Sequence, residues 1–340
     1  MGIVVKTRHL SVLPFILLMV ALLSCCQGLA QDSLGVRFFQ PAKEFNPKRF
    51  WTSAATGAVA YTGVVIGLSE VWYADYPRTS FQFFDDRGEW NDMDKYGHSF
   101  TAYFETSWCF SGAQWTGLER RKSLWLAAGL GSLFQATVET LDGFSAEWGF
   151  SVADIGFNTI GVGLFVGQEL LWREQRILLK VSSGSVDYPE TIVQAENSDA
   201  TYLLSQRADD LYGGSYAASF LKDYNAMTIW ASVNLHSFHR QGSQSKIPKW
   251  LNLAVGLGAG NLYGGFANEW EVEDDRFILS SEMYPRYRQF YLSPDIDLSR
   301  IPVKRPFFKM LLGVLNIFKL PAPALEVNTL GNVHWHWFHL

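Results

Sequence analysis

The segment Asn91–Phe100, NDMDKYGHSF, places Asp94, Lys95 and His98 within five residues of a chain that is otherwise rich in apolar residues. Residues four apart lie on one face of a helix, so Asp94 and His98 are expected to face the same way, while Lys95 is expected to point elsewhere. Polar groups among apolar helices are costly unless they are paired. The segment is therefore predicted to begin a helix and to contribute to a functional site.

The composition of the 340 residues limits the class of protein. Apolar residues make up 48% and aromatic residues 15%, while charged residues are only 18%. These values are more typical of a membrane-facing protein or an aromatic-rich interface than of an average soluble enzyme. The net charge of -5 and the lack of a basic stripe argue against nucleic acid as a partner.

Residues 1–30 are predicted to be a signal peptide, because basic residues precede an apolar core of about 15 residues and small residues precede a cut before Gln31. Two alternatives remain. The sequence LLSC, Leu22–Cys25, resembles a lipoprotein processing site, and the leader could also stay as an uncleaved anchor. The leader predicts export. Cys109 is the only cysteine after the leader, and we expect it to be a small buried residue.

Residues 50–180 are predicted to form an apolar helical domain, with helices over 53–73, 94–115, 118–143 and 151–176. The first segment is long enough to span a bilayer. Gly163 and Gly167 form a G-x-x-x-G pattern, which permits close approach of two helices, and Ser151 is a candidate N-cap. Since three of the four segments carry acidic residues, the helices could span a membrane, lie on its surface or pack as a soluble bundle.

The remainder of the chain divides into two regions. Residues 181–225 are predicted to be a linker with an amphipathic helix near 199–214. Residues 226–340 form a strand-rich C-terminal region, with strands over 228–238, 250–260, 288–301 and 333–340, a short helix over 307–320, and Pro248 and Pro294 as strand limits. The predicted fold class is α+β, a membrane-associated helical bundle of about four helices followed by strands. The last, aromatic strand is also typical of outer-membrane barrels, so a small barrel or pore formed with partner chains is a weaker alternative.

Three polar pairs recur in the helical half at helical spacing, and Gly161 extends the face of the last pair. The candidate catalytic residues are Asp94, His98, Glu139, Asp142, Asp154 and Asn158. In one interpretation, His98 is a general acid/base or a nucleophile that Asp94 orients. In another, His98 and carboxylates such as Glu139 and Asp154 hold a metal ion that activates water. The sequence leaves open whether a metal or other cofactor binds.

Each of these residues also has a structural interpretation. Asp94 could cap a helix, Asp142 could form a turn, and Asp154 could stabilise a helix start through the dipole. His98 could be a hydrogen-bonded core histidine, and Asn158 could link two helices. Two further histidines, His334 and His336, share one face of the last strand, where a surface belt of aromatic and histidine side chains is favoured over a metal site.

The segments DKYGHSFTAYF, ATVETLDGF and FSVADIGFNTIG resemble the YfiM-like family of predicted periplasmic lipoproteins, a domain of unknown function. The order D-K-x-x-H, E-x-x-D/Q and D-x-x-x-N-x-x-G is also similar to VanZ-like membrane proteins. The resemblance covers about residues 50–180. It implies an envelope protein in the periplasm or outer membrane of a Gram-negative bacterium, but no established reaction. The chain departs from the VanZ-like pattern in its exported leader, in Asp142 where Gln is usual, and in its long strand-rich extension.

Together these observations predict an exported, membrane-associated protein of the cell envelope. Its His/carboxylate residues would act on an envelope lipid or glycan, with membrane lipids and other envelope proteins as expected partners. The alternative is a non-catalytic scaffold protein in which the same residues form a buried hydrogen-bond network.

Overall fold

The computed structural model describes residues 38–71, 78–146, 148–214, 219–220, 222–239 and 246–340. The chain divides into two units, residues 1–41 and 42–340, and every element described below belongs to the second unit. The predicted signal peptide, residues 1–30, lies outside the described residues.

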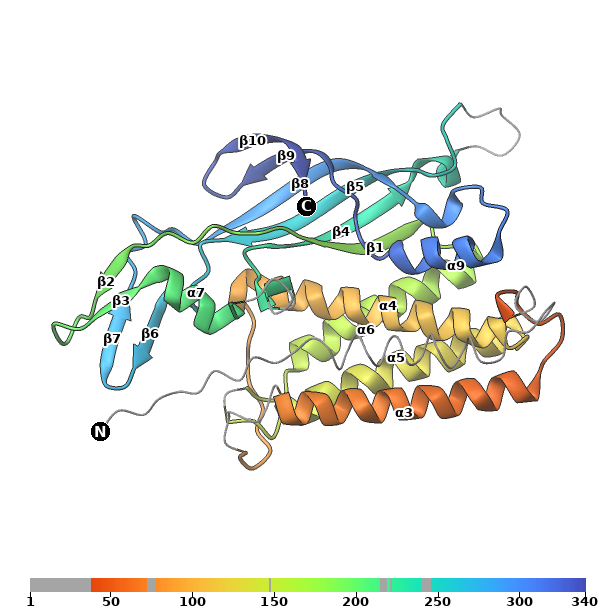
Figure 1. Cartoon of the computed structure of the whole chain (residues 1–340), viewed down its shortest axis with the longest axis horizontal. Coiled ribbons are helices and arrows are strands. Elements are labelled where there is room, and N and C mark those ends of the chain that lie inside the picture. The colour runs from red at the N-terminus through yellow and green to blue at the C-terminus, as the bar shows by residue number, and fades with distance from the viewer. Residues whose placement is uncertain (1–37, 72–77, 147, 215–218, 221, 240–245) are drawn as a thin grey trace. The chain divides into compact units, whose positions relative to one another are not determined.

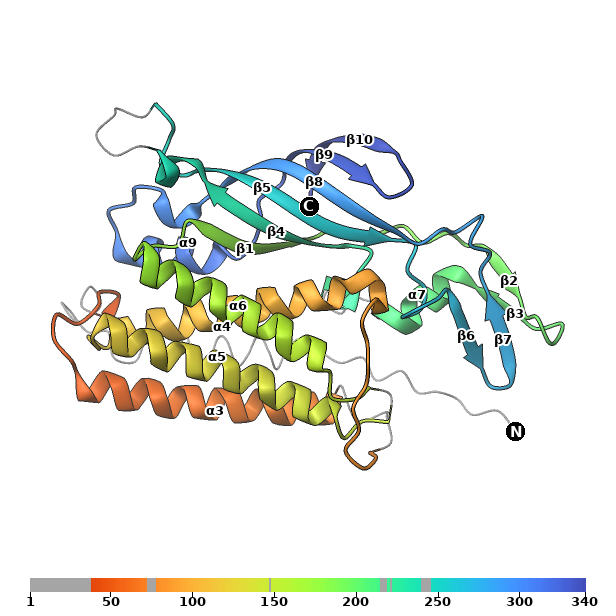
Figure 2. The same ribbon diagram turned by 180° about the vertical axis from the view of Figure 1, so that it is seen from behind.

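The helical half contains the predicted helices α3 (Pro47–Val71), α4 (Met93–Trp115), α5 (Arg120–Asp142) and α6 (Val152–Leu171) (Figures 1 and 2). Ser151 caps α6 as expected, since its hydroxyl accepts a hydrogen bond of 3.0 Å from the backbone N–H of Asp154. Apolar residues at helical spacing on α4, α5 and α6 form a shared core that includes Tyr103, Phe110, Leu124, Ala127 and Phe165. Cys109 packs against this core, as a small apolar residue would.

Small residues allow α4 to approach its neighbours closely, but at other positions than the sequence pattern suggests. A Cβ atom on Gly161 of α6 would lie 2.2 Å from the carbonyl oxygen of Ser99 on α4. The close approach that the G-x-x-x-G pattern would permit at Gly163 and Gly167 is not made among the described residues, because a Cβ on either would meet no described atom within 4 Å. Any side chain at position 161 would therefore push α4 and α6 apart.

None of the described helices is long and apolar enough to cross a membrane. The sequence leaves open whether residues 53–73 span a bilayer, and α3, which contains the described part of that segment, is not such a helix. Helix α3 instead packs on α5, where the ring of Tyr61 stacks on Phe134 at 4.9 Å and its hydroxyl contacts Thr137.

The second half forms an antiparallel six-stranded sheet in the order β1-β4-β5-β8-β9-β10. The strands are β1 (Ile177–Ser183), β4 (Met227–Asn234), β5 (Leu251–Gly260), β8 (Tyr287–Ile296), β9 (Ala322–Asn328) and β10 (Val333–His339). The sheet is rolled, since His339 at the end of β10 stacks on Tyr291 of β8 and lies 5.7 Å from the ring of Trp230 on β4. The predicted α+β class, with helices first and strands after, is thus confirmed, while membrane association stays a prediction.

Two strands of this sheet, and one proline, differ from the sequence expectations. β1 follows directly on the helical half, and β9 begins in a proline-rich segment that shows no strand pattern. Pro294 lies inside β8, where it pairs with Leu253 of β5. It does not end the strand because β9 pairs only with residues 289–292, so one side of β8 has no hydrogen-bond ladder at this proline.

The region predicted as a linker is more structured than expected. It contains β2 (Ile192–Gln194), β3 (Thr201–Leu203) and the short helix α7 (Leu204–Tyr212), and the amphipathic helix is shorter than predicted. Strands β6 (Glu269–Val272) and β7 (Asp275–Ile278) form a second hairpin that shares a core with the first. The described residues also form α9 (Pro306–Leu315), the short helix that the sequence predicts. They further form the 3₁₀ turns η1 (Glu89–Asp92), η2 (Leu235–Phe238) and η3 (Leu298–Arg300).

The first turn of α4 joins the helical half to the sheet. Met93 is buried against Val181 of β1, Ile229 of β4 and Ala259 of β5. The next residue, Asp94, accepts a hydrogen bond of 3.1 Å from the hydroxyl of Tyr224, just before β4. This junction fixes the rotation of α4 about its axis, and with it the direction in which the following polar side chains point.

Candidate functional site

A tight backbone turn leads into α4. Trp90, Asn91 and Asp92 have positive φ angles of 49°, 53° and 61°, and the backbone N–H of Trp90 donates to the carbonyl of Gly265 at 2.8 Å. Asp92 is the N-cap residue of α4, so the alternative in which Asp94 caps the helix is wrong. Asp94 instead lies in the first turn, where its side chain is free to join a cluster.

Lys95 lies at the centre of this cluster. Its ammonium is 2.6 Å from Asp86, 2.9 Å from Asp94 and 2.7 Å from Asp154, and its side chain is only 1% exposed. The prediction that Lys95 points away from Asp94 and His98 is wrong. The helical wheel places only its Cβ, and four methylene groups let the ammonium reach back to carboxylates on its own helix and on α6.

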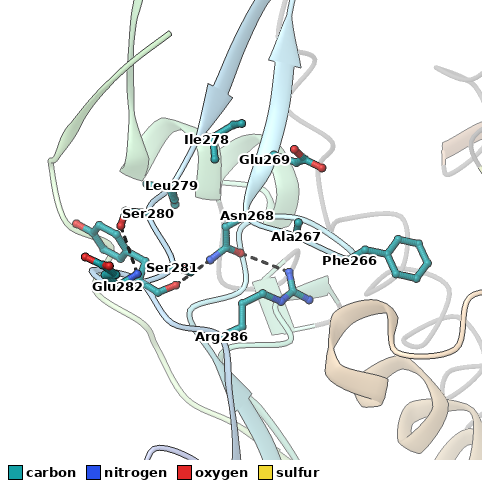
Figure 3. A pocket seen from close by; sticks show the side chains of 11 residues that line it. Phe266, Ala267, Asn268, Glu269, Ile278, Leu279, Ser280, Ser281, Glu282 and Arg286 are labelled. Carbon is teal, nitrogen blue, oxygen red and sulfur yellow. Dashed lines mark hydrogen bonds between the residues drawn. The ribbon is translucent and has the colours of Figure 1, made fainter. Parts of the chain in front are cut away.

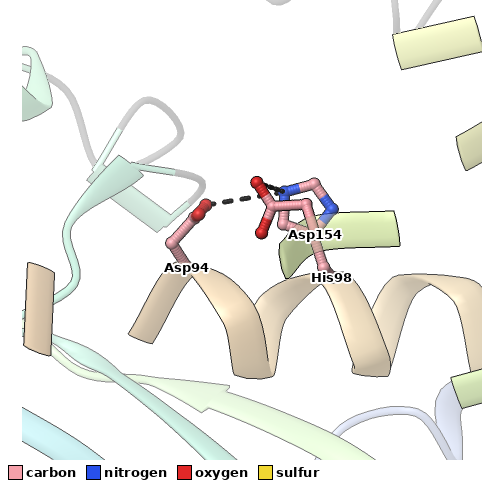
Figure 4. Close-up of side chains that lie close together, drawn as sticks. All are labelled: Asp94, His98 and Asp154. Atoms are coloured by element: carbon pink, nitrogen blue, oxygen red, sulfur yellow. Dashed lines mark ion pairs between the residues drawn. The ribbon is translucent and has the colours of Figure 1, made fainter. Parts of the chain in front are cut away.

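His98 uses both ring nitrogens within the same cluster. Nε2 lies 3.7 Å from a carboxylate oxygen of Asp94 and 3.7 Å from one of Asp154, as Figure 4 shows. Nδ1 lies 3.2 Å from the side-chain oxygen of Asn158 and 3.5 Å from Glu139. One edge of the imidazole therefore faces two carboxylates from α4 and α6, and the other faces α5 and the second turn of α6.

We call this group the His98 cluster, and it consists of Asp86, Asp94, Lys95, His98, Glu139, Asp154 and Asn158. The structure thus brings together five of the six residues that the sequence singles out. Asp142 is the exception, since it lies at the end of α5 and affects the cluster through its charge, which raises the pKa of Glu139. Sequence reasoning missed Lys95 and Asp86.

Two hydroxyl groups that are not among the predicted site residues support the cluster. Ser151 donates to Asp86 at 2.6 Å while its own oxygen caps α6, so a single side chain positions both the loop carboxylate and Asp154. Tyr224 binds Asp94 from 130 positions further along the chain. No spacing rule could have found Tyr224, because only the packing of the sheet against α4 brings it there.

Burial differs sharply among the members of the cluster. The side chains of Glu139 and Lys95 are 1% exposed and that of Asp154 is 6% exposed. The side chains of Asp94 and His98 are 23% and 17% exposed. The cluster therefore opens to its surroundings at one edge, where Asp94 and His98 lie side by side.

The cluster holds more acidic than basic groups, and this shifts their proton affinities. Burial raises the pKa of Glu139 to about 8 and that of Asp154 to about 7, the latter with help from the charge of Asp94. Burial alone would lower the pKa of His98, but Asp94, Asp154 and Glu139 outweigh it and hold the pKa above its usual value. These groups titrate as one coupled system, so a proton can be shared among them near neutral pH.

These shifts predict that the stability of the fold falls as pH rises from 6 to 9. A carboxyl whose pKa is raised in the folded chain stabilises the fold below its unfolded pKa and loses that contribution as pH rises through the folded value. The raised pKa of His98 acts in the same direction. The check is urea denaturation at pH 6, 7, 8 and 9, and Glu139→Gln should flatten the dependence while the control Glu119→Gln, at an exposed carboxyl, leaves it unchanged. A pH dependence that Glu139→Gln leaves as steep as in the wild type contradicts the assignment.

Three of the residues have the spacing of a metal site. Asp94, His98 and Asp154 each offer a ligand atom, and these atoms lie within 4.8 Å of one another. However, the other oxygens of both carboxylates already face the ammonium of Lys95. A divalent ion would have to displace the proton of His98 and lie beside this buried positive charge. The donor set therefore suits an acid/base centre better than a metal centre.

A separate cavity of about 580 Å³ lies at the β6–β7 hairpin. Figure 3 shows the side chains that line it. Its lining contains no member of the His98 cluster. The guanidinium of Arg286 points at Asn268 and also binds the backbone carbonyls of Gly264 and Gly265. Because Arg286 and Asn268 hold the hairpin and its loop together, this cavity is a weaker candidate for chemistry than the His98 cluster.

Comparison with known protein families bears on where in the cell the protein is located. Residues 82–167 match a family described as "Predicted periplasmic lipoprotein (DUF2279)". This segment contains every member of the His98 cluster. The description is consistent with the predicted export to the periplasm or outer membrane, but it assigns no reaction, and it does not test the VanZ-like motif order. No curated protein and no solved structure matches the chain.

Proposed function

We propose that the His98 cluster is the acid/base centre of an exported protein that works at an envelope membrane on a lipid or glycan substrate. One observation carries the proposal. Asp94 and His98, the most exposed pair of an otherwise buried set of charges, are adjacent, and Nε2 of His98 lies 3.7 Å from a carboxylate oxygen of Asp94. Strongly perturbed pKa values at such an edge are typical of functional sites.

The geometry supports hydrolysis of an ester or glycosidic bond. Protonated His98 would donate the Nε2 proton to the leaving oxygen as the bond from carbon to that oxygen breaks. Asp94 or Asp154 would take a proton from the attacking water, whose oxygen forms the new bond to carbon. The pKa of Asp154, raised to about 7, suits this exchange. Asn158 and Glu139 would orient the ring through Nδ1.

The proposal is tested in a strain that lacks the protein, with survival in detergent and lysozyme as the measure of envelope integrity. The wild-type chain should restore survival. His98→Gln should fail to restore it although the variant reaches the envelope in normal amount. His236→Gln is the matched control, because His236 lies in η2 outside the cluster, and it should restore survival fully. Full restoration of survival by His98→Gln would contradict the proposal.

A specific observation also favours a scaffold function, namely that Lys95 is buried and ties together Asp86, Asp94 and Asp154. In that case the cluster fixes helix register and the protein serves to bind other envelope proteins. Asp94→Asn separates the two functions, because it keeps the shape of the side chain. A scaffold then restores survival in proportion to the amount of folded protein, whereas an acid/base centre loses function with the melting temperature nearly unchanged.

A further inference from the structure

The two faces of the rolled sheet have opposite chemical character. On the inner face, Lys180 of β1 and Asp295 of β8 form an ion pair of 2.8 Å in which both side chains are fully buried. Ser232 donates to Asp295 at 2.6 Å, and Asn252 donates to Ser232 at 2.8 Å. Asn234 continues the network with a bond of 2.7 Å to Asn252. Charges and amides thus occupy the enclosed side of the sheet.

The outer face is apolar across the middle of the sheet, and its polar side chains, Ser183 of β1 and Arg288 of β8, lie in the rows toward one end. One row crosses all six strands through Leu179, Ala231, Val255, Leu292, Leu325 and Trp335. The next row on the same face crosses them through Val181, Ile229, Leu257, Phe290, Val327 and Val333. Neither row contains a polar or charged side chain.

Only half of this outer face is covered by the described residues. Val181 and Ile229, on β1 and β4, are 5% and 6% exposed, because α4 packs over them. Strands β8, β9 and β10 lie farther from the helices (Figures 1 and 2). The same rows are open there and on β5, with Val255 at 48%, Leu292 at 45% and Trp335 at 55% exposure. The two rows are therefore apolar both where α4 packs over them and where it does not.

We propose that the open half of the outer face, on β5, β8, β9 and β10, contacts the acyl chains of a lipid bilayer. An antiparallel sheet in water turns its polar face outward and its apolar face to the core. This sheet does the reverse, which is the pattern of strands whose outer side meets lipid. The apolar positions from Leu251 to Leu257 span about 20 Å along β5, close to the apolar band of about 25 Å that such strands present to a membrane.

The composition of the open face favours lipid over a second protein chain as its partner. Interfaces with protein partners carry hydrogen-bonding groups at the rim, whereas these rows are apolar to their last residue, Trp335 or Val333, on the edge strand β10. Tryptophan at the border of an apolar face is typical of membrane-water boundaries. A location in the periplasm or outer membrane places a bilayer within reach of this face.

The test measures lipid contact by one side chain, because an acyl group at Cys25 would by itself hold the protein on a vesicle. The processed protein is purified from the envelope and reconstituted in vesicles of phosphatidylethanolamine and phosphatidylglycerol, with or without bromine on the acyl chains. Bromine quenches tryptophan fluorescence only on contact. Trp335→Phe should remove a distinct part of the quenched signal, while the control Trp270→Phe, at a buried position of the β6–β7 hairpin, should leave it unchanged.

Two further variants complete the design. Leu292→Asp, on the open face, should lower the quenching of Trp335 at least tenfold, while Ile192→Asp, at an exposed position of β2, should not. His98→Gln should leave the quenching intact, so failure of the acid/base proposal stays separable from failure of this one. Quenching that does not depend on Trp335 would overturn the proposal. So would a stable dimer that shields Trp335 and that Leu292→Asp dissociates, because a second copy would then cover the face.

Discussion

Replacing Lys95 by methionine is expected to lower the free energy of unfolding by about 3–5 kcal/mol, enough to unfold much of the protein at 37 °C. The ammonium is buried among three carboxylates, and each lies within 2.9 Å of it. Methionine fills a similar volume but leaves these groups without their shared cation, so they must either stay charged in a poorly solvated place or take up protons. The measurement is urea denaturation at pH 8, followed by circular dichroism.

The control is Lys122→Met, at a lysine whose side chain is 71% exposed and pairs with Glu119 on the surface of α5. Exposed ion pairs contribute little, so this variant should change the unfolding free energy by no more than about 0.5 kcal/mol. The Lys95→Met variant should regain part of its loss at pH 6, where the carboxyl groups protonate more readily. Equal stability of the two variants would mean that the cluster does not hold the helices together.

Replacing Lys180 by methionine is expected to lower the free energy of unfolding by a similar amount, about 3–5 kcal/mol. The reason is that the carboxylate of Asp295 would stay buried inside the rolled sheet without its cation. Asp295 would keep only the hydroxyl of Ser232 as a donor to Oδ2, and its other oxygen has no hydrogen-bond partner among the described residues. The lost bond from Lys180 to the carbonyl of Ile296, 2.8 Å long, adds to the loss. Thermal unfolding measured by circular dichroism would show the effect.

A double variant distinguishes the loss of the attraction between Lys180 and Asp295 from the cost of leaving the Asp295 carboxylate buried without a cation. Lys180→Met with Asp295→Leu removes both charges and should recover more than half of the stability lost in the single variant, since an apolar pair of similar volume can replace a buried ion pair. If the double variant is less stable than Lys180→Met alone, then the carboxylate of Asp295 contributes through its hydrogen bond to Ser232 and not through the ion pair.

The fold was predictable where a local pattern decides it. The four long helices follow from apolar residues at helical spacing and from the Ser151 cap, and β4, β5, β8 and β10 follow from alternation. β1 and β9 were missed because their pairing is decided by strands far along the chain, and Pro321 before β9 and Pro323 within it conceal its alternation. The inward direction of the polar residues was also unreadable, because alternation shows two faces but not which of them is enclosed.

The candidate site was predictable as far as helix geometry extends. Asp94 with His98, and Asp154 with Asn158, share helix faces because residues four apart do so on any helix. Lys95 was missed because a long flexible side chain does not follow the direction of its Cβ. Asp86 was missed because a backbone turn brings it to α4, and Tyr224 because the packing of the sheet does so. Neither effect can be predicted from the spacing of residues along the chain.

The central claim is that His98 transfers protons in a reaction on an envelope molecule. The most direct test is to incubate the purified protein, at pH 7, with lipid and glycan fractions from the envelope of a strain that lacks it, and to follow new products by mass spectrometry. Wild-type protein should cleave a substrate into two products whose summed mass exceeds that of the substrate by one water. His98→Gln should form them about 10²–10⁴-fold more slowly while its unfolding curve stays close to that of the wild type. Equal rates for the two proteins would contradict the account.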